Sequence, residues 1–65
     1  MMWVLSQTTT YENGRTDTAY FLRKGLFGMQ EYGRKADAMK FNTKREATLY
    51  AKALAGKHTA VKEEQ

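Results

Sequence analysis

The chain has 65 residues, of which 42% are hydrophobic and 28% are charged, and it contains neither cysteine nor proline. A chain of this length forms one domain and buries only about 60% of the surface that its unfolded form exposes, so its core is small. The absence of cysteine excludes disulfide bonds and thiolate metal sites, and it favours a cytoplasmic protein over a small secreted scaffold.

Charge and hydropathy narrow the classes of partner. Eleven Lys and Arg residues against seven Asp and Glu residues give a net charge of +4, which weakly favours an acidic partner and argues against mimicry of DNA. The longest apolar run, residues 1–5, is far shorter than the ~20 residues that span a bilayer, so no membrane association is predicted. We expect a single domain over residues 1–65, with a frayed tail at about 63–65.

The first predicted element is a long β-hairpin. Residues 2–12 are rich in the β-branched and aromatic types that suit strands, and Asn13-Gly14 favours a two-residue type I′ turn before a return strand over residues 15–24. With Asn13 and Gly14 as the turn, Thr9 faces Thr18, Leu5 faces Leu22 and Trp3 faces Lys24. Glu12 then lies opposite Arg15, a favourable cross-strand pair.

This register distributes apolar side chains over both faces of the hairpin. One face carries Trp3, Leu5, Tyr11, Tyr20 and Leu22, and the other carries Met2, Val4, Ala19 and Phe21. A single helix can cover only one face, so the other is predicted to bind a partner chain, most simply as a two-fold homodimer.

A short third strand and one helix follow. Glycines at 25, 28 and 33 bracket a predicted strand within residues 29–32. Thr43 and Glu46 have the spacing of a capping box, and Ala47, Tyr50, Ala51 and Leu54 form one apolar stripe. The helix is expected to end near Ala55, where Gly56 can adopt the left-handed conformation.

The segment 58–62 is predicted to be the last strand, returning to the sheet. The predicted fold class is therefore α+β: a small antiparallel sheet, made of a long N-terminal hairpin and short strands, with one helix packed on one face. Which face the helix covers is left open.

Residues for catalysis are scarce. His58 is the only histidine, so a hydrolase triad has one candidate base, and an ordinary surface or strand residue is the more economical interpretation. One histidine with scattered carboxylates cannot form a closed metal site. The prediction is a non-enzymatic protein with no catalytic, cofactor-binding or metal-binding residues.

Two candidate binding surfaces remain. The first is the uncovered sheet face with its neighbouring aromatics, predicted to bind a protein through Val4, Phe21, Leu26, Phe27 and Tyr32. The second is a group of basic residues near Tyr32 and Phe41, which could follow a nucleic-acid backbone or, at a dimer junction, hold a small anionic nucleotide; its members are Arg34, Lys35, Lys40, Lys44 and Arg45. The alternative for the basic group is a solvated rim that keeps the protein soluble.

The segment 38–47, Ala-Met-Lys-Phe-Asn-Thr-Lys-Arg-Glu-Ala, resembles a helix-start pattern of small phage and prophage proteins, approximately A-x-x-F-x-T-x-x-E-A. The resemblance covers roughly residues 36–62. It implies a small ββ(β)αβ domain, commonly of unknown function, from a group whose members often bind a host macromolecule, including components of defence systems. It carries no functional residue, because the pattern consists of a packed Phe, a helix cap and a buried Ala.

Overall fold

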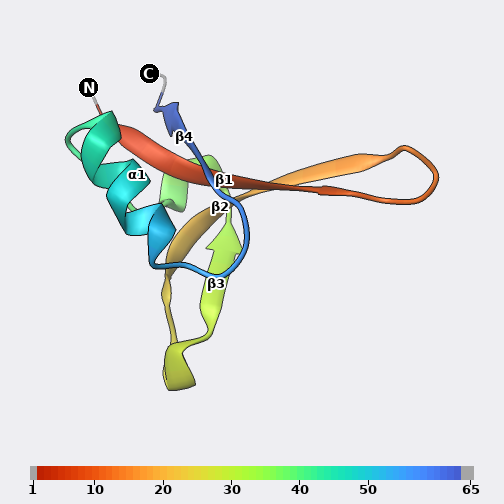
Figure 1. Cartoon of the computed structure of the whole chain (residues 1–65), viewed down its shortest axis with the longest axis horizontal. Helices are drawn as coiled ribbons and strands as arrows, with labels where there is room; N and C mark the ends of the chain where they lie inside the picture. The colour runs from red at the N-terminus through yellow and green to blue at the C-terminus, as the bar shows by residue number, and fades with distance from the viewer. Residues whose placement is uncertain (1, 64–65) are drawn as a thin grey trace.

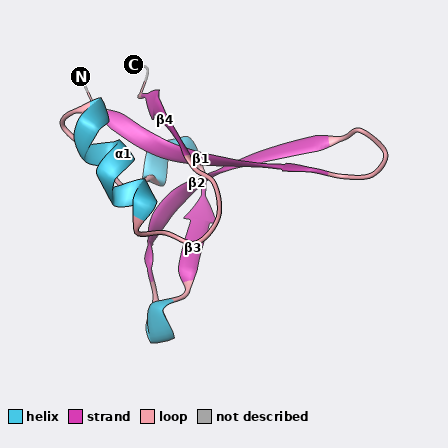
Figure 2. Cartoon of the chain, viewed as in Figure 1, coloured by secondary structure: helices cyan, strands magenta, loops and turns pink. Residues whose placement is uncertain are grey.

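The computed structural model describes residues 2–63 and shows a four-stranded antiparallel sheet with one α-helix (Figures 1 and 2). The strands are β1 (Trp3–Thr10), β2 (Thr16–Lys24), β3 (Gln30–Gly33) and β4 (Thr59–Lys62), in the spatial order β3-β2-β1-β4. Helix α1 (Lys44–Lys52) lies between β3 and β4 in the sequence, and two short 3₁₀ turns, η1 (Leu26–Gly28) and η2 (Lys35–Asp37), flank β3. The predicted α+β class is confirmed.

The register of the first hairpin differs by one residue from the prediction. Thr9 faces Asp17 rather than Thr18, and Thr8 faces Thr18. The loop has three residues, because the Tyr11 amide bonds to the Arg15 carbonyl and, within residues 2–63, Gly14 takes a positive φ (85°) whereas Asn13 does not. A three-residue loop with glycine in the left-handed position is the next most common hairpin connection after the two-residue turn.

A one-residue change of register reverses which side chains share a face. Phe21 now lies on the same face as Leu5, and both belong to the fully buried core with Ala47. The predicted grouping of Phe21 with Val4 is therefore wrong.

The predicted pairs Leu5–Leu22 and Trp3–Lys24 are also absent, because β1 and β2 separate beyond the Ser6–Tyr20 pair and another segment lies between them. Phe41 exchanges both backbone hydrogen bonds with Trp3, each 2.8 Å long, and the Met39 amide donates to the Phe21 carbonyl. Residues 39–41 thus continue the sheet where the hairpin opens.

Helix α1 begins as predicted. The Thr43 hydroxyl accepts from the Glu46 amide at 3.1 Å, although the Glu46 carboxylate returns to the Thr43 hydroxyl rather than to its amide. The helix ends at Lys52, three residues before the predicted Ala55. Beyond Lys52 the amides of Ala53 and Leu54 bond to carbonyls three residues earlier, as in a tighter turn, and Gln30 of β3 accepts from the amide of Ala55 and donates to its carbonyl.

Both faces of the central sheet are covered by the chain itself. The helix covers the Leu5 face, where Ala47 and Leu54 are buried. On the opposite face Val4 is fully buried and Ala38 is 5% exposed, and Lys35 lies over the Tyr20 ring, so residues 35–38 cover this side. The predicted apolar face awaiting a partner chain is therefore absent from the described part of the molecule.

Beyond this small core, two hairpins project into solvent in different directions, as Figure 1 shows. The first is the distal half of β1 and β2, which ends at residues 11–15, and the second is formed by β2 and β3 and ends at η1. The principal extents of 36 × 31 × 19 Å reflect this open shape. At the other end of the sheet, Glu63 donates its amide to the Met2 carbonyl, so the expected fraying does not include Glu63; residues 64 and 65 lie outside the described range.

Candidate binding site

The end of the β2–β3 hairpin is a tight loop, which we call the β2–β3 tip (residues 25–29). The Gly25 amide donates to the Met29 carbonyl at 2.7 Å, and the Gly28 and Met29 amides close the 3₁₀ turn onto the Gly25 and Leu26 carbonyls. These bonds fix the backbone of the loop, so the tip has a defined shape.

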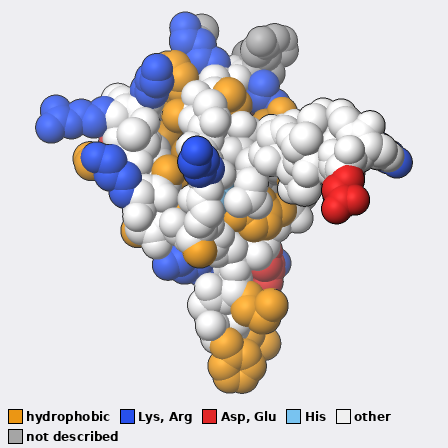
Figure 3. All heavy atoms as spheres, turned by 45° about the vertical axis from the view of Figure 1, so that its right-hand side comes forward, with side chains coloured by type: hydrophobic (Ala, Val, Ile, Leu, Met, Phe, Trp, Pro, Cys, Tyr) orange, Lys and Arg blue, Asp and Glu red, His pale blue; other side chains and the backbone are white. Residues whose placement is uncertain are grey.

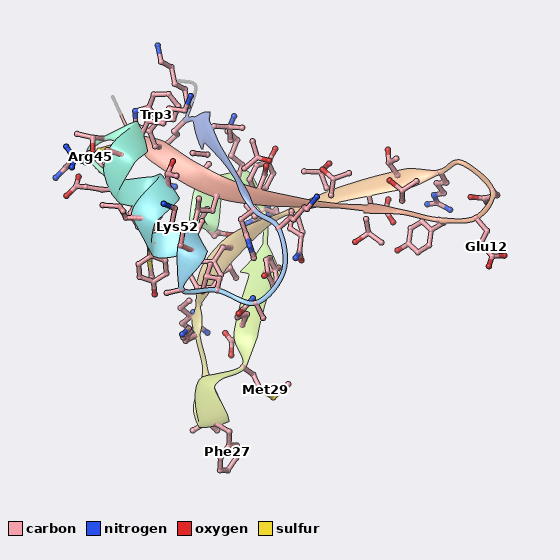
Figure 4. The ribbon with its side chains drawn as sticks, in the orientation of Figure 1. Trp3, Glu12, Phe27, Met29, Arg45 and Lys52 are labelled. Carbon is pink, nitrogen blue, oxygen red and sulfur yellow. The ribbon has the colours of Figure 1, made fainter. Side chains whose placement is uncertain are left out.

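The tip presents apolar side chains to solvent. Leu26 is 82% exposed, Phe27 is 98% exposed and Met29 is 69% exposed, and they form the apolar group at the bottom of Figure 3. Figure 4 shows Phe27 and Met29 pointing away from the body of the protein. Single exposed apolar residues are common, but three together at a projecting loop form a patch of the kind that marks an interaction site.

Phe27 also has an unfavourable backbone conformation. Its φ and ψ of 60° and 22° lie in the left-handed region, and no other non-glycine residue within 2–63 has a positive φ. A left-handed conformation costs a side-chain-bearing residue about 1–2 kcal/mol, and the exposed ring regains none of this through burial. The isolated chain therefore gains no stability from Phe at this position.

The arm behind the tip is fastened to the body. Arg23 forms a 2.9 Å ion pair with Glu31 across the two strands, and Gln30 bonds to the Ala55 backbone. The Tyr32 hydroxyl bonds to both Gln30 and His58, and the Tyr32 ring packs edge-on against Phe21. These contacts link β3 to the segment after the helix, so the tip is held in a fixed direction.

The structure divides the residues predicted to bind a partner protein. Leu26 and Phe27 are exposed at the tip, whereas Val4 and Phe21 are fully buried and cannot contact a partner as predicted. Tyr32 is half-buried and supports the arm. Sequence reasoning missed Met29 as a surface residue; its position directly after Gly28, next to Leu26-Phe27, was the available signal.

The residues of the predicted basic group also differ in their surroundings, and two of them form structural ion pairs. Arg34 pairs with Asp37, and Lys40 forms a 2.8 Å ion pair with Glu63 and also donates to the Lys35 and Ala36 carbonyls. Because these bonds engage its ammonium group and its side chain is only 28% exposed, Lys40 is a structural residue.

The remaining members of the basic group do not form one row. Lys35 lies over Tyr20, while Lys44 and Arg45 lie at the start of α1. There Lys44 and Lys62 place their ammonium groups 5.9 and 5.8 Å from the centre of the Trp3 ring. Trp3 and Lys62 were not predicted as site residues, and the pairing of Trp3 with Lys62 across β1 and β4 explains their proximity.

No protein-family model, no curated protein and no solved structure matches this chain. Within residues 2–63, none of the helices has the length and hydropathy needed to cross a membrane.

Proposed function

We propose that this is a non-enzymatic binding protein whose β2–β3 tip inserts Leu26, Phe27 and Met29 into an apolar pocket on a partner protein. The observation that carries the proposal is the Phe27 side chain, which is 98% exposed on a strained backbone. Large aromatic side chains that enter a desolvated pocket dominate the energy of many protein interfaces. A ring held at the end of a fastened arm also loses little conformational freedom on binding.

The nature of the partner follows from the residues around the tip. Arg23 and Glu31 neutralise each other, while Lys24 carries a positive charge next to the loop. An apolar pocket with an acidic rim would complement this arrangement. The resemblance of residues 36–62 to small phage proteins supports a host protein, such as a defence component, as the target.

The test compares capture of host proteins by the immobilised wild-type chain and by two variants. Phe27→Ser removes the proposed anchor, and Leu49→Ser is the control because Leu49 is also exposed (55%) but lies on the helix. We expect a host protein that binds the wild type and the Leu49 variant but is lost with the Phe27 variant, while both variants keep the wild-type melting temperature. Equal capture by all three chains would reject the tip as the binding element.

A second candidate function is the binding of single-stranded nucleic acid at the Trp3 end of the molecule. It is favoured by one arrangement, the two ammonium groups of Lys44 and Lys62 around an indole ring, with Arg45 next to Lys44. Figure 4 labels Trp3 and Arg45 at this same end. Cationic side chains beside an aromatic ring are the elements with which proteins bind phosphates and stack bases.

Trp3 is the only tryptophan, so its fluorescence reports on this candidate directly. Titration with a thymidine oligonucleotide should quench Trp3 emission if the site binds, and the affinity should fall steeply as salt is raised. Converting Lys44 and Lys62 to Gln should abolish the quenching, whereas converting Lys52 and Lys57 to Gln should not. No quenching at about 50 mM salt, where electrostatic binding is strong, would eliminate this candidate.

A further inference from the structure

The loop that ends the first hairpin carries a chemical feature that the proposed function does not use. Asn13 and Gly14 lie in this loop, and every residue from 11 to 18 is exposed. Figure 4 labels their neighbour Glu12 at the end of the projecting hairpin, away from the β2–β3 tip. Asparagine is a thermolabile residue, because the amide nitrogen of the next residue can attack its carboxamide. The surroundings of Asn13 therefore decide whether this loop is chemically reactive.

The Asn13 carboxamide is held against the backbone of the loop. Its Oδ1 accepts a hydrogen bond from the Arg15 amide at 2.9 Å, so the side chain folds back across the Gly14 peptide in an Asx turn. A donor on a carbonyl oxygen draws electron density from the carbon, and this donor lies where negative charge develops when the carbon is attacked. The Arg15 amide therefore activates Cγ of Asn13 toward a nucleophile.

The nucleophile is the amide nitrogen of Gly14. This residue has no side chain to shield it, and open space surrounds the position where a Cβ would lie. In the folded loop the Gly14 N–H donates to the Tyr11 carbonyl at 2.9 Å, and this bond must open before the nitrogen can lose its proton and attack. The distal half of the hairpin, residues 7–19, contains no buried residue, so this opening needs local fraying and not global unfolding.

The second asparagine of the chain, Asn42, is exposed as well but lies in different surroundings. The residue after it is Thr43, whose β-branched side chain crowds the amide nitrogen that would attack. The backbone is also fixed on both sides, because Phe41 exchanges two hydrogen bonds with Trp3 and the Thr43 hydroxyl caps α1. Asn42 is thus an internal control for the reactivity of Asn13.

We propose that Asn13 is a site of spontaneous covalent modification, at which water converts the asparagine to aspartate or isoaspartate. Hydroxide removes the Gly14 amide proton, the nitrogen forms a bond to Cγ of Asn13, and the Cγ–Nδ2 bond breaks. The departing nitrogen takes a proton from water and leaves as ammonia, and a five-membered succinimide ring remains. Water then opens the ring: attack at Cγ gives aspartate, and attack at the main-chain carbonyl of Asn13 gives isoaspartate. The net reaction converts an amide and water to a carboxylate and ammonium, with no oxidation or reduction.

Both products change the loop. A carboxylate replaces a neutral amide in a segment, residues 11–18, that already contains Glu12 and Asp17 and has Arg15 as its one cation, so negative charges repel each other. Isoaspartate also adds a methylene group to the main chain, which alters the spacing of the loop that the Tyr11 amide and the Arg15 carbonyl close. The modification therefore loosens the end of this hairpin and leaves the core and the β2–β3 tip unchanged.

Incubation of the purified full chain at neutral and at mildly alkaline pH tests this assignment. Intact mass and peptide mapping follow the exchange of an amide for a carboxylate, and methylation by protein isoaspartate methyltransferase detects isoaspartate. Asn13→Gln and Asn42→Gln are the matched variants, because glutamine keeps the carboxamide but must close a larger ring, which forms much more slowly. We expect the wild type and Asn42→Gln to convert at the same rate, faster at the higher pH, and Asn13→Gln to stay unmodified over the same time.

A synthetic peptide of residues 8–18 supplies the rate of the unstructured sequence. We expect Asn13 of the folded chain to convert within about tenfold of the peptide rate, because fraying of an exposed loop costs little free energy, and at least about tenfold faster than Asn42. In the modified protein, amide exchange at Tyr11 should be faster and exchange at Phe21 unchanged. A folded chain whose Asn13 stays intact while the peptide converts, or whose Asn42 converts as fast as Asn13, would overturn the proposal.

Discussion

The hydroxyl of Tyr32 lies 2.5 Å from Nε2 of His58, and the two rings stack with an interplanar angle of 14°. The other ring nitrogen, Nδ1, lies 3.2 Å from the Gly56 carbonyl, which can only accept, so in the neutral ring the tautomer that satisfies both contacts has its proton on Nδ1 and accepts from Tyr32 at Nε2. Gln30 in turn donates to the Tyr32 oxygen at 2.7 Å. A single chain of hydrogen bonds therefore joins the arm behind the tip to the segment between α1 and β4.

Removing the Tyr32 hydroxyl should weaken this connection. Tyr32→Phe keeps the ring against Phe21 but leaves Gln30 and His58 without their common partner, and we expect a loss of about 1–2 kcal/mol in the free energy of unfolding. Urea denaturation measures it. Tyr11→Phe is the control, because Tyr11 is 48% exposed, and its substitution should change stability by less than about 0.5 kcal/mol. A Tyr32 variant as stable as the control would show that the chain of bonds contributes nothing.

Phe27→Gly should remove the proposed binding residue without lowering the stability of the fold. Glycine adopts φ near 60° without the penalty that Phe27 incurs, and the lost side chain is almost entirely exposed, so the variant should be as stable as the wild type or up to about 1 kcal/mol more stable. Leu26→Gly provides the comparison: Leu26 has no positive φ, and glycine there should lower stability by about 0.5–1 kcal/mol. Thermal denaturation of the two variants distinguishes them, and a clear loss of stability with Phe27→Gly would contradict the strain argument.

The sequence was sufficient to predict the elements whose signals are local. Thr43 and Glu46 predict the start of the helix, and the spacing of Ala47, Tyr50 and Ala51 predicts its core-facing side, because caps and stripes depend on neighbouring residues. The hairpin register was not predictable in the same way. Asn-Gly is compatible with both a two-residue and a three-residue loop, and only the backbone angle of Asn13 distinguishes them.

The parts that sequence reasoning missed depend on contacts between distant residues. Residues 39–41 enter the sheet beside Trp3, and residues 35–38 cover the face of Val4, although no periodic pattern marks either segment. The exposure of Phe27 follows from the length of the β2–β3 arm relative to the small core, which cannot be read from residue types. The binding tip was therefore predicted only in part, through Leu26 and Phe27.

Gly14→Val should loosen the distal half of the first hairpin, residues 7–19, without unfolding the core. Valine resists the φ of 85° that Gly14 adopts, while this part of the hairpin contains no buried residue. A local loss of about 1.4 kcal/mol would accelerate amide exchange at Tyr11 about tenfold, with a much smaller effect at Phe21. Gly14→Asn should be tolerated, since Asn adopts the left-handed conformation more readily. Unchanged exchange at Tyr11 in the valine variant would contradict the three-residue loop.

Substitutions of two lysines should distinguish structural from surface positive charge. Lys40→Met keeps the apolar stem but removes the ammonium group that bonds to Glu63 and to two backbone carbonyls, so a half-buried carboxylate loses its partner; we expect a loss of about 2 kcal/mol. Lys44→Met removes an exposed charge near Trp3 and should change stability by no more than about 0.5 kcal/mol. Urea denaturation of both variants decides between the assignments. If the two losses were equal, Lys40 would belong with the surface lysines, and the predicted basic group would regain a member available to bind an anion.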